Sequence, residues 1–446
     1  MSSKTSLNRR QLLALAGATP FATSAGLGAC ANASFAPGTD VTKHAGHKDP
    51  NESQYFAAVS KALKRAGLYR PTMVIDRDRL TANINTVQSK IAPGMHYRAV
   101  TKSLPSSGLI DFVLKQANTR RLMAFHQPFI NTAAANWPDS EILVGKPMPV
   151  GAAAEFYRAH KPSSFNPSQQ IQWLIDTPHR LNQYRDFAEA TDQTLLVSLE
   201  LDVGFHRGGI ATAEDLAACL EILSQSQRLK LAGMMGYDGH VSLFPDLVGP
   251  PETSIPMTSA KFDAAIAQAR STLTDLDTEA LTLNTAGSTT YMHYASGQQY
   301  TPANDISVGS GLVKPLFCDK TQPDHLAAAF IASPVLKRNE KVRVPGLLDD
   351  PKGGAQDDLD RDQTIFIYGG RWMADPHYPE GLAPHPIYGR SSNQDMFTLP
   401  ASINIAPDDF VFLRPRQSEA VLLQFGDLAI YSQGEIIDFW PLLETA

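Results

Sequence analysis

From about residue 71, short apolar runs alternate along the chain with longer stretches that have the spacing of amphipathic helices. The apolar runs that have the length of buried strands are Tyr97–Lys102, Leu122–Phe125, Ile142–Gly145, Ile171–Asp176, Leu195–Asp202, Leu229–Tyr237, Leu281–Ala286 and Ile306–Gly309. Helical stretches between them include Gly108–Asn118, Ala152–His160, Arg180–Ala190, Ala213–Ser224 and Ser259–Leu273. Eight such units in series predict an α/β chain with a (β/α)8 barrel.

The pattern changes at about Ala327, where short strands with turn residues between them replace the alternation. The predicted strands are Ile331–Val335, Lys341–Val344, Thr364–Tyr368, Asp409–Arg414, Leu422–Phe425, Leu428–Tyr431 and Glu435–Phe439. The segment Leu347–Asp362 is rich in Gly, Pro and Asp and predicts a loop. Residues 53–326 are therefore expected to form the barrel, and residues 327–446 a β-rich second domain.

Composition narrows the functional classes. The 446 residues are 43% hydrophobic and 19% charged, enough for two domains with a substantial core. A net charge of −6 does not suggest a broad nucleic-acid-binding surface. The three cysteines, Cys30, Cys219 and Cys318, do not form a disulfide framework, and the chain has no CxxC or HExxH motif for zinc.

The first thirty residues have the pattern of an export signal. The segment Asn8–Leu13 contains Arg9 and Arg10 and resembles a twin-arginine signal, and a mildly apolar run follows it. Leu27–Cys30 resembles a bacterial lipobox, which would make Cys30 the lipid-carrying first residue; the alternative is an ordinary cleavage near Ala29–Ala31. Residues 31–52 are small and polar and predict a tether. The protein is therefore expected in the periplasm or cell envelope, with a lipid anchor in the membrane if the lipobox is real.

Lys102 stands at the end of the first predicted barrel strand. It follows an apolar segment at 71–76 and a helical stretch at 79–91. That order resembles the start of the alanine-racemase-like, fold-type III pyridoxal-phosphate (PLP) enzymes. The resemblance implies that Lys102 carries PLP as a Schiff base, and that the strand near 71–76 joins the C-terminal β domain. A partly desolvated lysine at a barrel mouth favours the neutral, nucleophilic amine; the alternative is a surface lysine at the start of a loop.

Two further segments carry the resemblance. Leu199–Ile210 is similar to the family's D-x-G-x-x-R-x-G run, which implies that Arg207 faces the cofactor; the alternative is an arginine paired with a nearby carboxylate. Leu231–His240 resembles the G-x-x-x-Y-x-G-H segment of D-threonine aldolases and D-serine dehydratases. Tyr237 is then expected beside the ring or the substrate, and His240 is expected to assist proton transfer or else to be a loop histidine bonded to backbone.

The last two predicted barrel strands are followed by loops rich in Gly, Ser and Thr. They lie within Asn284–Tyr291 and Asp305–Gly311. Backbone amides and hydroxyls in such loops bind anions, and this end of a barrel is the usual phosphate cradle. The expected phosphate-binding residues are Gly287, Ser288, Thr289, Gly309 and Ser310, although one such cluster alone would be only a turn.

The C-terminal part resembles the same family but departs from it at one motif. Ile436–Pro441 is similar to the family's closing strand. In Pro415–Glu419, Gln417 and Glu419 stand where the family has a His and a Cys or Asp that bind a divalent metal. A Gln–Glu pair lacks the imidazole and thiolate that suit zinc, although its oxygens could hold a hard cation weakly. No metal site is therefore expected, and a divalent cofactor is doubtful.

The resemblance implies a PLP-dependent lyase that acts at Cα and Cβ of a small D-amino acid, like D-threonine aldolase or D-serine dehydratase. An amino-acid racemase or epimerase with the same cofactor is the alternative enzyme, because racemisation needs no metal at the β-hydroxyl. A lipoprotein that binds PLP or an amino acid without turnover is the alternative from another class, but pure binding does not need the amine of Lys102. The resemblance also implies a homodimer.

Overall fold

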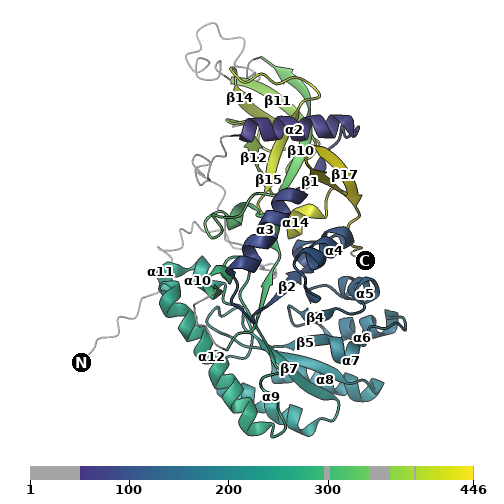
Figure 1. The fold of residues 1–446 in the computed structure, drawn as a ribbon, viewed down its shortest axis with the longest axis vertical. Coiled ribbons are helices and arrows are strands. Elements are labelled where there is room, and N and C mark those ends of the chain that lie inside the picture. Colours follow the sequence, from purple (N-terminus) through teal and green to yellow (C-terminus); the bar gives the residue numbers. More distant parts are fainter. Residues whose placement is uncertain (1–50, 296–301, 341–361, 386–387, 445–446) are drawn as a thin grey trace, which may run out of the picture. The chain divides into compact units, whose positions relative to one another are not determined.

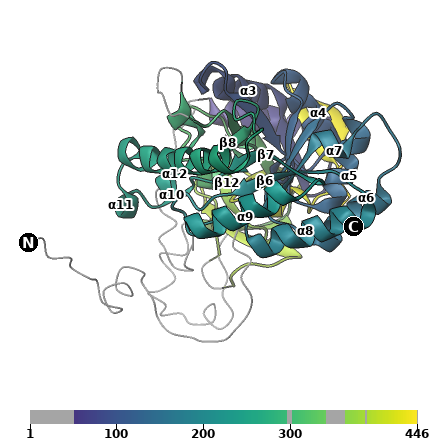
Figure 2. The same ribbon diagram turned by 90° about the horizontal axis from the view of Figure 1, so that it is seen from below.

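A computed structural model describes residues 51–295, 302–340, 362–385 and 388–444. Eight parallel strands close into a barrel in the order β2 to β9 (Figure 2). They are β2 (His96–Val100), β3 (Arg121–Ala124), β4 (Glu141–Val144), β5 (Ile171–Ile175), β6 (Leu195–Glu200), β7 (Leu229–Met235), β8 (Thr282–Thr285) and β9 (Asp305–Val308). The barrel predicted from the sequence is thus confirmed, strand for strand.

Helices connect the strands on the outside of the barrel. They include α3 (Arg77–Lys90), α4 (Ser107–Gln116), α5 (Gln127–Asn136), α6 (Val150–Ala159), α7 (Pro167–Gln170), α8 (Pro178–Thr191), α9 (Ala213–Gln225) and α12 (Pro251–Thr272). Local sequence explains several starts: the side chains of Asp76, Thr177 and Thr212 each accept a hydrogen bond from an amide in the first turn of the helix that follows. Helix α12 begins before the predicted Ser259, and Pro256 lies inside it.

Alternate residues of the barrel strands form layers inside the barrel. Val100, Met123, Leu143, Leu174 and Met235, from five different strands, form one apolar cluster. Because successive side chains of a strand point to opposite faces, residues two positions away on the same strands belong to the layers above and below. The apolar layer thus separates the carboxyl ends of the strands from their amino ends.

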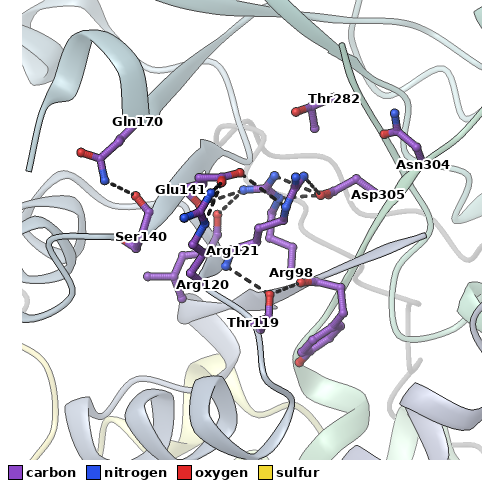
Figure 3. Close-up of polar contacts among 12 residues, drawn as sticks. Arg98, Thr119, Arg120, Arg121, Ser140, Glu141, Gln170, Thr282, Asn304 and Asp305 are labelled. Atoms are coloured by element: carbon purple, nitrogen blue, oxygen red, sulfur yellow. Dashed lines mark hydrogen bonds and ion pairs between the residues drawn. The ribbon is translucent and has the colours of Figure 1, made fainter. Parts of the chain in front are cut away.

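The layer at the amino ends is polar (Figure 3). The buried side chain of Arg98 forms two hydrogen bonds to the carboxylate of Asp305, each 3.0 Å long, and Arg121 donates to the same carboxylate at 3.0 Å. Glu141 accepts from Arg120 at the barrel edge. These paired charges close the end of the barrel opposite the expected active site.

A second sheet has nine strands, most of them antiparallel, and its main path runs β13-β14-β11-β10-β1-β16-β17. Its strands are β1 (Thr72–Asp76), β10 (Ala329–Asn339), β11 (Asp362–Tyr368), β12 (Ala374–Tyr378), β13 (Ala383–Pro384), β14 (Gln394–Pro400), β15 (Phe410–Pro415), β16 (Leu428–Ser432) and β17 (Glu435–Trp440). Helix α2 (Glu52–Arg65), purple in Figure 1, lies across this sheet, and Phe56 and Leu63 pack in a cluster with Val74, Phe330 and Phe412.

β1 pairs antiparallel with β10 and parallel with β16, so the strand that precedes the barrel belongs to the C-terminal sheet. The expected strand near 71–76 is thus β1, and both of its neighbours come from the C-terminal part of the chain.

One predicted strand is wrong. Leu422–Phe425 is not extended, because Glu419–Leu422 forms the short helix α14 and Leu423 keeps a helical backbone. Strands β12, β13 and β14 were not predicted. The expected strand Lys341–Val344, nearly all of the loop Leu347–Asp362, the export signal in residues 1–30 and almost all of the tether in 31–52 lie outside the described residues.

Among the helices of the described segments, none combines the length and the apolar character needed to span a bilayer.

Candidate active site

Lys102 lies directly beyond β2, in the 3-10 turn Thr101–Ser103 at the carboxyl end of the barrel. Its Nζ atom is 4.6 Å from the centroid of the Phe125 ring and 3.5 Å from Oε1 of Glu419. The side chain is 30% exposed. An amine held between an aromatic face and a carboxylate, and still open to solvent, can react with a small molecule that enters the mouth.

Glu419 begins α14, and its two carboxylate oxygens have different surroundings. Oε1 accepts hydrogen bonds from the hydroxyls of Ser103 at 2.8 Å and Ser310 at 3.2 Å and also faces Lys102. Oε2 accepts a longer hydrogen bond of 3.3 Å from the Ser418 hydroxyl. Burial favours the neutral acid, but the charge of Lys102 and the serine hydrogen bonds outweigh it and hold the pKa of Glu419 below its usual range. Glu419 is therefore an anion at neutral pH.

A second carboxylate, Glu200, ends β6 at the same face of the barrel. Burial raises its pKa to about 7; the charge of Arg207 opposes that shift, and the nearby Asp176 and Asp202 add to it. Glu200 therefore changes its charge near neutral pH.

The loop after β6 is held by Asp202. Its Oδ1 accepts from the amides of Gly204 and His206, and its Oδ2 lies 2.8 Å from His206 Nδ1. Gly204 and His206 both have positive φ, so the chain turns sharply here. This turn brings Arg207 to the mouth, where its guanidinium carbon lies 5.0 Å from the ring centroids of both Phe205 and Tyr237.

Tyr237 follows β7, and its ring fits between two glycines. A Cβ atom on Gly239 would lie 2.5 Å from this ring, and one on Gly287 would lie 2.7 Å from it. Burial, with the charge of Asp238, raises the pKa of Tyr237 to about 12, so the phenol is neutral at physiological pH. The two glycines are thus required for the ring to pack at the start of both loops.

His240 begins the short helix α10 (His240–Leu243) and is buried. Its ring stacks on Phe205 with centroids 6.2 Å apart, and burial lowers its pKa. Nδ1 is buried and has no hydrogen-bond partner among the described residues, so the predicted alternative of a backbone-bonded histidine does not describe this atom. A neutral imidazole with a free nitrogen can accept or donate a proton once a partner arrives.

The loops after β8 and β9 meet at the same face of the barrel. Ser288 Oγ accepts from the Gly311 amide at 2.9 Å. A Cβ on Gly309 would lie 2.7 Å from Val100 Cβ and 2.9 Å from Ser103 Cβ, so this loop packs directly against the segment that carries Lys102. The predicted phosphate loops and Lys102 therefore lie at the same end of the barrel.

Behind the β8 loop, Asp238 fixes the backbone by accepting from the hydroxyls of Thr290 at 2.6 Å and Tyr294 at 2.9 Å. The neighbouring Thr289 has a buried hydroxyl that makes no hydrogen bond of good geometry among the described residues, although it lies close enough to the Tyr237 phenol to lower that group's pKa. A fixed loop with an unsatisfied buried hydroxyl is suited to a bound anion.

Gln417 and Glu419, the residues at the family's metal position, are both half-buried. Oε1 of Glu419 contacts Lys102 and the hydroxyls of Ser103 and Ser310. Within the described parts of the chain, no group of three or more His, Cys, Asp or Glu side chains is arranged to hold a metal ion.

The sequence interpretation missed several residues at the mouth: Phe125, Asp176, Glu200 and the contact of Glu419 with Lys102. Alternation along the strands would have found the first three, since Phe125, Asp176 and Glu200 each lie two positions beyond an inward-facing residue of β3, β5 or β6. The Lys102–Glu419 contact joins residues from two domains, and no local pattern indicates it.

Comparison with known proteins agrees with this architecture. The family model for the alanine racemase N-terminal domain matches residues 75–314, more than half of the chain. The comparison with curated proteins gave no match.

Several solved structures share the fold at low sequence identity. D-threonine aldolase from Filomicrobium marinum is 15% identical with a TM-score of 0.61, and the match covers 84% of this chain and 95% of that one. D-threo-3-hydroxyaspartate dehydratase from Delftia sp. HT23 is 17% identical with a TM-score of 0.59, over 84% and 97% of the two chains. Alanine racemase from Bacillus anthracis is 13% identical with a TM-score of 0.61, over 84% and 98%. The chain therefore belongs to the alanine-racemase-like, fold-type III pyridoxal-phosphate family.

Proposed function

We propose that this protein is a PLP-dependent lyase that acts at Cα and Cβ of a small D-amino acid with a β-hydroxyl group. The observation that carries the proposal is the position of Lys102, a solvent-accessible amine at the barrel mouth, beside Glu419 and the two glycine- and serine-rich loops. The similarity in fold to a D-threonine aldolase and a D-3-hydroxyaspartate dehydratase supports this substrate class.

The residues present fit the cofactor. Lys102 would supply the amine for its aldehyde, and the buried hydroxyl of Thr289, beside the Tyr237 phenol, would supply a donor for its phosphate. The two loops that would hold the phosphate also contain Gly287, Ser288, Gly309 and Ser310. The PLP ring would lie near Arg207 and Tyr237. PLP, when bound, supplies an electron-withdrawing ring that accepts the electron pair left at Cα.

The chain's own groups then have distinct tasks. Lys102 moves a proton to or from Cα, and Tyr237, flanked by Gly239 and Gly287, limits the space at the mouth. His240 offers a free nitrogen for a second proton transfer. Glu419 remains charged throughout.

A racemase is the second candidate. Racemisation needs an acid and a base at Cα but no bond cleavage at Cβ. The observation that favours it is that Tyr237, a neutral phenol able to donate a proton, follows β7 at the same end of the barrel as Lys102. Non-catalytic binding is disfavoured because it would not need the accessible amine of Lys102. We further propose that the protein is a homodimer and is exported by the twin-arginine route, with a lipid on Cys30.

Two measurements on the purified protein test the proposal. We expect a visible or near-ultraviolet absorbance band that borohydride removes, with PLP fixed to the peptide that contains Lys102 in mass spectrometry. D-Threonine and D-serine are then supplied, and the products are separated as glycine plus aldehyde, keto acid plus ammonia, or the opposite enantiomer. PLP fixed elsewhere, or not at all, would refute the assignment; enantiomer alone would establish the racemase.

A further inference from the structure

The geometry points to a new role for Glu419: we propose that it selects the substrate, by accepting a hydrogen bond from a neutral β-hydroxyl side chain and repelling an acidic one. This inference rests on the proposed function and specifies its substrate class. It assigns to Glu419 a task that needs no metal ligand at that position.

The two carboxylate oxygens of Glu419 differ in how many hydrogen-bond donors surround them. Oε1 is surrounded by Ser103, Ser310 and Lys102 at 2.8, 3.2 and 3.5 Å. Oε2 accepts the longer hydrogen bond of 3.3 Å from the Ser418 hydroxyl, and the backbone amide of Glu419 also contacts this carboxylate. A carboxylate oxygen has about two lone-pair directions, so Oε2 keeps acceptor capacity that Oε1 has used.

Glu419 also lies beside Lys102 at the mouth of the barrel. Glu419 and Lys102 are 29% and 30% exposed, so both reach the open mouth of the barrel. A substrate whose Cα lies beside the Lys102 amine has its β-hydroxyl oxygen two bonds further away, and Oε1 of the Glu419 carboxylate is 3.5 Å from that amine. The free oxygen of Glu419 is therefore within reach of a β-hydroxyl donor.

The negative charge of Glu419 distinguishes neutral from acidic substrates. The low pKa of Glu419 agrees with a full negative charge at neutral pH, and Glu200 and Asp176 add acidic groups at the same face. A carboxylate on the substrate that approaches Glu419 is repelled by this negative charge. A substrate with a side-chain carboxylate is disfavoured, and a neutral hydroxyl is accepted.

The test compares two substrates that differ mainly in this charge: D-threonine and D-threo-3-hydroxyaspartate. In the PLP-loaded wild-type protein we expect kcat/KM for D-threonine to be at least about tenfold higher. Glu419→Gln should bring the ratio close to one by improving the acidic substrate, and Glu419→Asp, which keeps the charge, should restore the preference. Glu155→Gln, which removes a carboxylate from the exposed surface of α6, is the matched control and should leave the ratio unchanged.

A binding measurement gives a readout that does not depend on turnover. Calorimetric titration of PLP-loaded Lys102→Ala should show weak binding of D-aspartate, and the added change Glu419→Gln should tighten it by about tenfold. If PLP is not fixed to Lys102 in the wild-type protein, both this inference and the proposed function fail. If PLP is fixed there but the preference and the D-aspartate affinity are the same with Gln as with Glu at position 419, only the role of Glu419 is overturned.

Discussion

Arg98 and Asp305 meet inside the barrel through two parallel hydrogen bonds, each 3.0 Å long, between side chains that are 1% and 0% exposed. β2 and β9 are neighbours in the barrel, so this pair joins the first and last strands where the barrel closes. Arg121 also donates to Asp305 at 3.0 Å. The pair is therefore expected to contribute to closure, and its two members depend on each other.

Asp305→Asn should be strongly destabilising. The change leaves the buried guanidinium of Arg98 without its counter-charge, and breaking a buried pair in this way costs about 3–5 kcal/mol of the free energy of unfolding. Urea denaturation followed by circular dichroism measures the loss. Asp275→Asn, in an exposed segment, is the matched control. A loss below about 1 kcal/mol would show that the pair adds little to stability.

Lys102→Ala should remove covalent attachment of PLP and all turnover while the protein remains folded. The side chain is 30% exposed and contacts mainly the Phe125 ring and Glu419, so little packing is lost. Absorbance after borohydride treatment and the melting temperature are the two measurements. A reducible, covalently attached cofactor in this variant would contradict the assignment.

Gly309→Ala should weaken PLP binding at least about tenfold, because a Cβ atom there would lie 2.7 Å from Val100 and 2.9 Å from Ser103 and would displace the segment that carries Lys102. Gly151→Ala is the matched control. Its Cβ would meet nothing within 4 Å, and alanine in helix α6 is expected to stabilise by up to about 1 kcal/mol. Fluorescence titration of the apoprotein with PLP compares them, and equal affinities would contradict this packing.

Glu200→Gln should change how stability depends on pH. The pKa of Glu200 is raised to about 7 in the folded protein, so between its ordinary value and pH 7 the folded state binds more protons than the unfolded state. Wild-type stability therefore falls as pH rises through this range, and the variant lacks that term. We therefore compare the free energy of unfolding of the variant with that of wild type at each pH. After allowance for the partial exposure of Glu200, this difference should favour the variant by about 1–2 kcal/mol more at pH 8 than at pH 4. Denaturation at both pH values measures it; a constant difference would contradict the raised pKa.

The protein is expected to contain no stoichiometric zinc, and its activity should survive a chelator. Gln417 has a neutral amide where an imidazole would suit zinc, and Oε1 of Glu419 already contacts Lys102 and serine hydroxyls. Elemental analysis and assays with and without EDTA measure both properties. One tightly bound zinc per chain, with activity lost on chelation, would show that Pro415–Glu419 has been misinterpreted.

The barrel could be predicted from the sequence because its signals are local. A buried parallel strand is a short apolar run, and each of the eight runs, from Tyr97–Lys102 to Ile306–Gly309, overlaps a strand of the structure. The strands of the second sheet were harder to predict. β14 (Gln394–Pro400) contains polar residues at its start, and Leu422–Phe425 is apolar because its side chains pack from a helix and turn, not from a strand.

For the site, the segments that contain Lys102, Arg207, Tyr237, Gly287 and Gly309 could all be found from the sequence, because each follows a barrel strand and such ends converge. Their roles in binding and catalysis remain predictions. The hydrogen bonds from Ser103 and Ser310 to Glu419 could not be predicted, because these three residues are far apart in the chain and meet only when the second domain folds.

The place of β1 sets the order in which the chain can mature. β1 leaves the ribosome before the barrel, yet its two neighbours, β10 and β16, are synthesised only after it. Until residue 432 has emerged, at least one edge of this apolar strand stays unpaired and open to aggregation or proteolysis. Lys102 likewise gains its carboxylate neighbour only when residue 419 arrives. A prematurely terminated chain should therefore be both unstable and incomplete at its active site, so that quality control of the fold also acts as quality control of the catalyst.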